Sequence, residues 1–346
     1  MQKNKKVLIG MSGGVDSTVS ALLLKEEGYE VEGVYMKLHA KSGYHEIHFA
    51  RAQKAADFAG IKLHLLDLQE LFNEKVFLPF IETYKKGKTP NPCALCNRNL
   101  KFGAMVDFAD KIGAYHVATG HYIQTDGEYF YAAEDDTKDQ SYFLFYVDKT
   151  ILPRLLFPLG KRKKSDIKEY AASIDGLESF ASQSESSEIC FVETNYTDIL
   201  KEYTNVDKIG DVLDTDGKVV GEHKGYMHYT IGKRKGFSVR GAHDPHYVLN
   251  INPLTNQITV GQKESLACNY VEINSINMFT NKKEFKASVK LRYRTKAVVA
   301  KIIIEDDKAI IELEDNVYGV AKGQAAVFYD DTKLLGGGWI TGVEKK

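Results

Sequence analysis

Two cysteines stand in a segment whose neighbouring residues suit thiol chemistry. Thr89–Asn97 reads Thr-Pro-Asn-Pro-Cys-Ala-Leu-Cys-Asn, which predicts an extended entry that becomes helical only after Pro92, with a helix starting near Cys96. A thiol at a helix N-terminus has its thiolate stabilised by the helix dipole, and the cations Arg98 and Lys101 would act in the same direction. We therefore predict that Cys96 is a nucleophile.

A further cysteine, Cys190, lies in Ser186–Phe191, part of a polar, serine-rich loop that starts at Ser182. A buried structural cysteine is less expected in such a loop than in an apolar strand. Sulfur transfer needs two thiols, because one carries a persulfide and the other frees the sulfur by attacking it, which leaves a disulfide. Cys190 and Cys96 fit these roles, whereas Cys268 is expected to serve only packing.

A glycine-rich loop follows the first predicted strand and precedes a helical pattern. It comprises Gly10, Met11, Ser12, Gly13, Gly14, Val15, Asp16 and Ser17. Adjacent glycines let successive N–H groups point at one anion, hydroxyls add donors, and the helix N-terminus adds partial positive charge. Asp16 would repel a bare phosphate, so we expect Mg²⁺ between its carboxylate and the phosphate oxygens. The loop lacks the ending of a Walker A motif and the spacing of a dinucleotide fingerprint, which disfavours a GTPase or a dehydrogenase.

The elements around this loop alternate apolar runs with helical patterns, as in a parallel α/β sheet. Predicted strands are Val7–Met11, Val31–Leu38, Leu63–Leu68 and Val117–Thr119. After Asn99, apolar residues at four-residue spacing predict a helix with one face on the core. That face consists of Leu100, Ala104, Phe108 and Ile112.

The character of the chain changes near residue 205, where turn signals replace long helical patterns. Residues 285–343 look entirely β, because Val298–Ile304 alternates in hydropathy, Glu305–Lys308 supplies a turn, and Ala309–Leu313 alternates back. We predict three domains: a catalytic parallel-sheet domain over 1–204, a small central domain over 205–275, and a C-terminal β-barrel over 276–346.

The composition is that of a globular protein. Hydrophobic residues make up 43% and charged residues 27% of the chain, which argues against disorder, collagen and coiled coil. No stretch approaches the roughly 18 uninterrupted apolar residues of a membrane span, so we expect a cytoplasmic protein with no membrane partner. The formal net charge of −1 means that any RNA site must come from local patches such as Lys161–Lys164 or Lys233–Lys235.

The motif Ser12–Ser17, Ser-Gly-Gly-Val-Asp-Ser, resembles the pyrophosphate loop of the N-type ATP pyrophosphatases, which adenylate an oxygen and release pyrophosphate. The resemblance implies an adenine nucleotide alpha hydrolase-like fold that binds ATP across the carboxyl ends of the strands, beside Met36 and Gly120. This superfamily includes amide-forming synthetases and RNA-modifying thiolases, so the loop alone does not choose the product.

The likeness to one family runs nearly from end to end of the chain. Together with the two cysteine segments, the chain resembles bacterial tRNA-specific 2-thiouridylases in Ala118–Tyr122, Lys138–Leu144, Tyr229–Gly236, Gly319–Tyr329 and Gly336–Gly338. The resemblance implies that ATP adenylates the 2-oxygen of the wobble uridine of tRNA and that persulfide sulfur on Cys190 displaces AMP, with Cys96 assisting release.

The same resemblance implies a base pocket at Pro90, Asn91 and Pro92, with His121 and Gln140 nearby. It implies tRNA contacts from Lys138, Asp139, Gln140, Arg292, Tyr293 and Gln324. ATP and Mg²⁺ are the implied cofactors. The implied partners are tRNA and a sulfur-donor protein, either a cysteine desulfurase or a sulfur-relay protein.

One departure from the family pattern concerns Cys93, where many members have an aspartate thought to help proton transfer. A thiol could act as a weaker acid or base, pair with Cys96, or join Cys96 and Cys190 in an iron–sulfur cluster, which we do not favour. Two rival functions stay open. An amide-forming ligase would not need the two loop cysteines, and a non-enzymatic RNA-binding or metal-cluster protein would not need Asp16.

Overall fold

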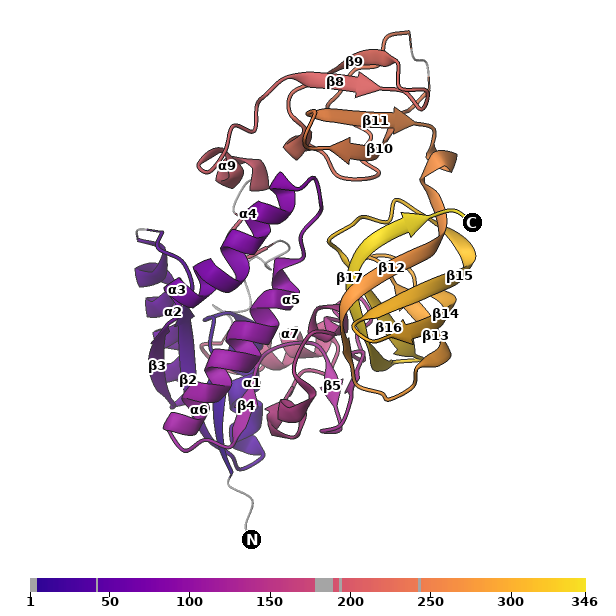
Figure 1. The fold of residues 1–346 in the computed structure, drawn as a ribbon. Helices are drawn as coiled ribbons and strands as arrows, with labels where there is room; N and C mark the ends of the chain where they lie inside the picture. The colour runs from indigo at the N-terminus through magenta and orange to yellow at the C-terminus, as the bar shows by residue number, and fades with distance from the viewer. Residues whose placement is uncertain (1–4, 42, 178–188, 193–194, 242–243) are drawn as a thin grey trace. The chain divides into compact units, whose positions relative to one another are not determined.

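The computed structural model describes residues 5–41, 43–177, 189–192, 195–241 and 244–346 (Figure 1). The serine-rich segment predicted to precede Cys190, Ser182–Glu188, lies outside the described residues. The chain forms two compact units, each assembled from separate stretches. The first unit consists of Met1–Val76, Cys93–Ser187 and Asp331–Leu335, and the second of Phe77–Pro92, Glu188–Asp330 and Gly336–Lys346.

A five-stranded parallel sheet forms the centre of the first unit, in the order β3-β2-β1-β4-β7. Its strands are β1 (Lys6–Gly10), β2 (Glu30–Lys37), β3 (Lys62–Asp67), β4 (His116–Ala118) and β7 (Leu155–Leu156). The four strands expected from apolar runs are confirmed to within one residue. The strand β7 was not predicted, because two residues carry no readable periodicity.

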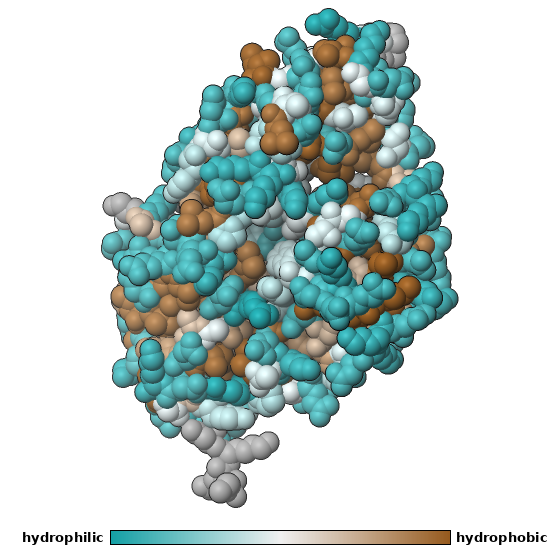
Figure 2. All heavy atoms as spheres, viewed as in Figure 1, coloured by the Kyte–Doolittle hydropathy of each residue, from teal (hydrophilic) through white to brown (hydrophobic). Residues whose placement is uncertain are grey.

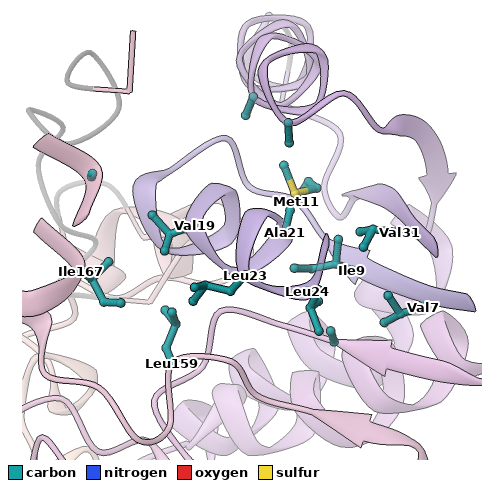
Figure 3. Packing of buried hydrophobic residues seen from close by; sticks show 14 of the residues in the cluster. Val7, Ile9, Met11, Val19, Ala21, Leu23, Leu24, Val31, Leu159 and Ile167 are labelled. Carbon is teal, nitrogen blue, oxygen red and sulfur yellow. The ribbon is translucent and has the colours of Figure 1, made fainter. Parts of the chain in front are cut away.

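Helices of the first unit pack on this sheet. They include α1 (Val15–Glu26), α2 (Tyr44–Ala59), α3 (Gln69–Phe72) and α7 (Lys164–Ala172). Figure 3 shows Ile9 of β1, Leu24 of α1 and Ile167 of α7 in one buried hydrophobic cluster. Burying one such side chain stabilises the fold by about 1.5–3 kcal/mol. This core holds the end of β1 and the start of α1, and therefore the loop between them.

The helical region that begins with the cysteine segment departs from the prediction. It consists of α5 (Pro92–Cys96), a wide-turned π-helical stretch over Asn97–Ala104, and α6 (Met105–Lys111). The predicted stripe at four-residue spacing is therefore wrong beyond Leu100, because a π-turn holds more residues than an α-turn and rotates the following face. The residues that this region buries are Leu100, Phe102, Met105, Val106 and Ala109.

Short elements complete the first unit. They are β5 (Gln124–Thr125), β6 (Phe130–Tyr131) and the 3₁₀ turns Ser141–Leu144 and Lys149–Arg154. The beginning of a later strand, β17 (Lys333–Glu344), pairs with β6 through Lys333 and Tyr131. These elements hold the loop over residues 132–140, which carries several of the predicted tRNA contacts.

The second unit begins with a helical cluster and a four-stranded sheet. In the cluster, α4 (Leu78–Lys85) packs against α9 (Tyr196–Lys201), and the rings of Tyr84 and Tyr196 stack with centroids 4.5 Å apart. The sheet has the order β10-β11-β8-β9. Its strands are β8 (Gly210–Leu213), β9 (Val219–His223), β10 (Tyr247–Asn252) and β11 (Gln257–Gly261).

The remainder of the second unit is a closed six-stranded barrel, in which β17 pairs with β12 to complete the ring. The other strands are β12 (Ala267–Met278), β13 (Glu284–Lys290), β14 (Val298–Glu305), β15 (Lys308–Tyr318) and β16 (Ala325–Asp330). The predicted turn at Glu305–Lys308 joins β14 to β15, and Asp306 takes a left-handed φ of 53° there. The predicted combination of a parallel α/β sheet, a small central domain and a C-terminal barrel is confirmed.

Hydrophilic side chains cover most of the face drawn in Figure 2, and hydrophobic ones form scattered patches. Within the described ranges, no helix combines the length and the apolar character that a membrane crossing requires.

Candidate functional site

The phosphate loop connects β1 to α1 in the first unit and takes the form that its glycines predict. Gly13 has φ +77°, and a Cβ there would lie 2.8 Å from the backbone nitrogen of Ala52. Only glycine therefore fits both the backbone angle and the close approach of α2. The hydroxyl of Ser17 donates to the carbonyl of Gly14 (3.0 Å), and the loop leads into the N-terminus of α1, where N–H groups favour an anion.

The predicted adenosine neighbours lie at the same loop. A Cβ at Gly120 would lie 3.2 Å from the backbone nitrogen of Ser17, and one at Gly10 would lie 3.7 Å from Cε of Met36. The structure thus brings the ends of β1, β2 and β4 together at the carboxyl edge of the sheet. In open α/β sheets this edge is where nucleotides bind.

Asp16 has a partner that the sequence did not predict. The ammonium of Lys164 lies 2.6 Å from Oδ1 of Asp16, and the hydroxyl of Tyr122 donates to the same oxygen (2.9 Å). The Lys164 side chain is 9% exposed, whereas that of Asp16 is 36% exposed. Lys164 is the first residue of α7, and its N–H donates to Asp135 (2.9 Å), which fixes the start of the helix.

This pairing corrects the interpretation of the basic run Lys161–Lys164. The run was named above as a candidate RNA patch. Its first three side chains are exposed, but Lys164 is buried at the phosphate loop. The sequence signal that could have singled out Lys164 is its position at the start of a predicted helix, at the end of a basic run. Its carboxylate partner lies 148 residues earlier in the chain, which no local pattern reveals.

His121 is buried between a hydroxyl and an ammonium. Its Nδ1 lies 2.7 Å from Oγ1 of Thr119, and its Nε2 lies 3.3 Å from Nζ of Lys101. Burial, reinforced by the Lys101 charge, holds the pKa of His121 well below its usual value. Because Lys101 can only donate, Nε2 is the acceptor, and the neutral ring carries its proton on Nδ1.

The start of the helix that carries Cys96 also differs from the prediction. The helix α5 starts at Pro92 rather than near Cys96, since proline is well suited to the first helical position. Cys96 is therefore already one turn inside the helix, where the dipole acts more weakly. The head groups of Arg98 and Lys101, predicted to favour its thiolate, are directed to the carbonyl of Tyr146 (2.6 Å) and to His121. Cys96 itself is 7% exposed.

Cys190 belongs to the second unit and is exposed. It lies in a turn closed by a hydrogen bond from the N–H of Val192 to the carbonyl of Ile189 (2.8 Å). The ring of Phe191 packs edge to face against Phe80, with centroids 5.2 Å apart. Apolar neighbours thus anchor a turn in which Cys190 is exposed. Cys268, in contrast, is buried, and burial raises the pKa of its thiol to about 11, in line with a packing role.

The loop over residues 132–140 holds three predicted tRNA contacts in different environments. Asp139 is buried, and its carboxylate accepts hydrogen bonds from the N–H groups of Ala133 and Ser141 (both 3.1 Å). Gln140 accepts from the N–H of Tyr122 (2.9 Å), and Lys138 is half-buried. Asp139 thus shapes the loop that carries its two neighbours.

The remaining predicted contacts lie in the second unit. Pro90 and Asn91 precede α5, Pro92 is its first residue, and the amide of Gln324 donates to the carbonyls of Thr89 and Pro90. Arg292 donates to the carbonyl of Ile231 (2.9 Å), which ties its loop to the predicted segment Tyr229–Gly236. Tyr293, beside it, is half-buried.

Family models match three consecutive parts of the chain. They are a tRNA methyl transferase HUP domain over residues 5–194, a tRNA methyl transferase PRC-barrel domain over residues 197–262, and an aminomethyltransferase β-barrel domain over residues 266–340. Among curated relatives, the tRNA-specific 2-thiouridylase MnmA of Sulfurimonas denitrificans is 74% identical over 97% of this chain and 99% of its own length. The chain belongs to the MnmA family of tRNA-specific 2-thiouridylases.

Other members of the family support the same assignment. The MnmA proteins of Nitratiruptor and Campylobacter jejuni are 55% and 54% identical, again over 97% of this chain and 99% of their own lengths. The similarity therefore extends over both units, from the phosphate loop to the barrel, and the resemblance stated from the sequence motifs is confirmed.

Proposed function

We propose that this member of the MnmA family catalyses the ATP-dependent 2-thiolation of the wobble uridine of tRNA. The observation that carries the proposal is the 74% identity with a 2-thiouridylase over 97% of the chain. The arrangement at the phosphate loop supports it, because an anion-binding helix start and an acidic side chain lie at the carboxyl edge of a parallel sheet.

In the proposed reaction, the uridine 2-oxygen attacks the α-phosphorus of ATP and pyrophosphate leaves. The terminal sulfur of a Cys190 persulfide then bonds to C2, and AMP departs with the former 2-oxygen. The Cys96 thiolate attacks the Cys190 sulfur and breaks the persulfide S–S bond, which leaves 2-thiouridine and a Cys96–Cys190 disulfide. An external dithiol must reduce that disulfide before a sulfur donor reloads Cys190.

Residues Gly10–Ser17 would hold the phosphates of ATP, with Met36 and Gly120 beside the adenosine. Bound Mg²⁺ would neutralise charge on the phosphate oxygens, and Asp16 is the carboxylate placed to ligate it. Asp16 accepts from Lys164 in this structure. We propose that Lys164 turns to a phosphate oxygen when Asp16 takes the metal, so that the pair keeps the site neutral before ATP arrives.

The proposed base pocket consists of Pro90, Asn91 and Pro92, with His121 and Gln140. A neutral His121 suits this role, because it brings no charge of its own next to a neutral base. Proposed tRNA contacts come from Lys138, Asp139, Gln140, Arg292 and Tyr293. Gln324, expected from the resemblance to contact tRNA, donates to the carbonyls of Thr89 and Pro90. The buried Asp139 would act by holding its neighbours in place.

We further propose that a cysteine desulfurase or a sulfur-relay protein delivers sulfur to Cys190 in the cytoplasm. The exposure of Cys190 supports delivery by another protein, since a donor must reach the thiol directly. Within the described part of the chain, no group of three His, Cys, Asp or Glu side chains is arranged to hold a metal ion. The role of Cys93 as an acid, base or cluster ligand stays a hypothesis for experiment.

The test is anaerobic incubation of the purified full chain with ATP, Mg²⁺, a persulfide donor and unmodified tRNA. Pyrophosphate and 2-thiouridine are measured for wild type, Cys190→Ser and Cys93→Asp. We expect thiolation to be lost in Cys190→Ser and retained in Cys93→Asp. A requirement for reconstituted iron would replace the persulfide route with cluster chemistry, and pyrophosphate release without modified nucleoside would contradict the thiolase function.

A further inference from the structure

The segment that precedes α5 is attached to one turn of the barrel. The N–H of Thr89 donates to the carbonyl of Lys322 (2.9 Å). In return, Nε2 of Gln324 donates to the carbonyls of Pro90 (2.8 Å) and Thr89 (3.3 Å). All of these residues belong to the second unit. The carbonyls of Thr89 and Pro90 thus receive a side-chain donor from the turn that precedes β16.

This segment is short of hydrogen-bond donors of its own. Pro90 and Pro92 have no N–H, so they cannot join a ladder or a tight turn as donors. The carbonyls of Thr89 and Pro90 take the Gln324 amide as a donor. Each neutral amide–carbonyl hydrogen bond makes a modest net contribution, and two of them together favour one conformation of this short segment.

Gln324 itself is held rigidly by the barrel. Its N–H donates to the carbonyl of Ala321 (3.3 Å), and its carbonyl accepts from the N–H of Ile340 in β17 (2.8 Å). The preceding residue, Gly323, has φ +91°, and a Cβ there would lie 2.8 Å from the carbonyl oxygen of Thr89. The turn therefore approaches the segment as closely as a backbone without a side chain permits.

We propose that Gln324 is a positioning residue, which fixes residues 89–92 through their carbonyls and so sets the geometry of the base pocket and the start of α5. This inference rests on the proposed function of residues 90–92 as the base pocket. It gives Gln324 a role in the protein without tRNA, whereas a direct tRNA contact would act only in the complex.

The first test uses Gln324→Met, which keeps the length of the side chain without its donors, and Gln324→Glu, which turns a carboxylate toward two carbonyl oxygens. Hydrogen–deuterium exchange of the peptide over residues 86–91 is measured in full-length protein without tRNA. We expect exchange to accelerate on the order of tenfold, as loss of roughly 1.4 kcal/mol of local stability requires. Unchanged exchange in both variants would overturn the proposal.

The second test separates turnover from binding. For a positioning residue, kcat for 2-thiouridine formation should fall on the order of tenfold or more, because small displacements in a reactive site are costly, while the Kd for unmodified tRNA stays within about twofold. A raised Kd with unchanged kcat would instead make Gln324 a tRNA contact. If wild type fails to thiolate, the proposed function fails, but the exchange test still decides what Gln324 does.

A glycine pair provides a matched control. Gly323→Ala should reproduce the exchange effect, because its methyl group collides with the Thr89 carbonyl. Gly319 has a comparable φ of +72°, but a Cβ there meets nothing closer than Cα of Gly232 at 3.9 Å. Gly319→Ala therefore carries the backbone strain without the collision and should leave exchange of residues 86–91 unchanged. Equal acceleration in both variants would show a general loosening of the barrel and contradict the proposal.

Discussion

Lys164 and His121 are two buried basic side chains of the first unit with opposite electrostatic partners. Lys164 faces the Asp16 carboxylate, whereas His121 faces the Lys101 ammonium. A carboxylate favours a charged neighbour, and an ammonium favours a neutral one. In the proposed function, Lys164 would offer positive charge to the phosphates of ATP, and His121 would offer a neutral ring near the base.

Replacing Lys164 with methionine tests the first assignment. The side chain keeps its length, but its positive charge is lost, so we expect kcat/KM for ATP in pyrophosphate release to fall by roughly 10²-fold, as when one charge-stabilising donor is removed. Steady-state kinetics and thermal melting are measured together. Lys161→Met, an exposed member of the same run, is the control and should remain within about twofold of wild type. Similar losses in both variants would refute a specific role for Lys164.

The neutrality of His121 predicts a dependence of stability on pH. The pKa of His121 in the fold lies well below the usual 6.5. As the pH falls below 6.5, the unfolded chain therefore binds a proton at His121 that the folded chain does not bind. Stability should therefore fall as pH decreases from 7 to 5, by up to about 1.4 kcal/mol per pH unit from this residue. In urea titrations, His121→Asn should show a shallower decline. Parallel declines for the two proteins would mean that His121 does not supply this dependence.

At the level of elements, the residues predicted to carry chemistry lie at junctions between one element and the next. The phosphate loop joins β1 to α1, and its Gly13 combines a left-handed φ with backbone contact to α2. The predicted nucleophile lies where α5 continues into a π-helical stretch, a form that is often found at functional sites. Both junctions depend on backbone geometry as much as on side chains.

Gly13→Ala should therefore weaken ATP binding strongly without unfolding the chain. The new methyl group would lie within 2.9 Å of backbone atoms of Arg51 and Ala52, so the loop or α2 must move. Isothermal titration with ATP and Mg²⁺ should show an affinity loss on the order of 10²-fold or more, since the loop N–H groups no longer converge. Gly113 has φ +72° with open space around it, so Gly113→Ala carries backbone strain alone and should bind ATP normally.

The sequence predicted most of these elements but not all of their junctions. Apolar runs located β1, β2 and β4, which contain buried residues, and also the edge strand β3, which is only partly buried. The helix over Asn97–Lys111 was misread after Leu100, because a four-residue spacing assumes uniform turns and the π-turn breaks that phase. The Lys164–Asp16 pair and the Gln324 contacts join residues far apart in the chain, which single-sequence patterns cannot register. The boundaries at 205 and 276 stay predictions.

At the scale of the whole molecule, each unit has its own core, and its stability depends on that core. Leu24 is 1% exposed in the cluster of the first unit shown in Figure 3. Leu24→Ala should destabilise this unit by about 2–5 kcal/mol, through lost burial and a residual cavity. Leu254, which is 95% exposed, supplies the control, and Leu254→Ala should change stability by less than about 0.5 kcal/mol. Thermal melts of the two variants would distinguish these outcomes. If Leu24→Ala melts at the same temperature as wild type, the stability of the first unit does not depend on this cluster.

The pairing of β17 with β6 has a consequence for synthesis on the ribosome. Asp331–Leu335 belongs to the first unit, where Lys333 pairs with Tyr131 and the carbonyl of Thr332 accepts from the N–H of Ala132. At translation rates of about 5–20 residues per second, this stretch is made roughly seven to thirty seconds after Ser187. The nascent first unit therefore lacks its last strand segment while the four-stranded sheet of the second unit and most of the barrel are synthesised. A chain that stops before Asp331 would leave the edge of β6 unpaired and open to association with other strands.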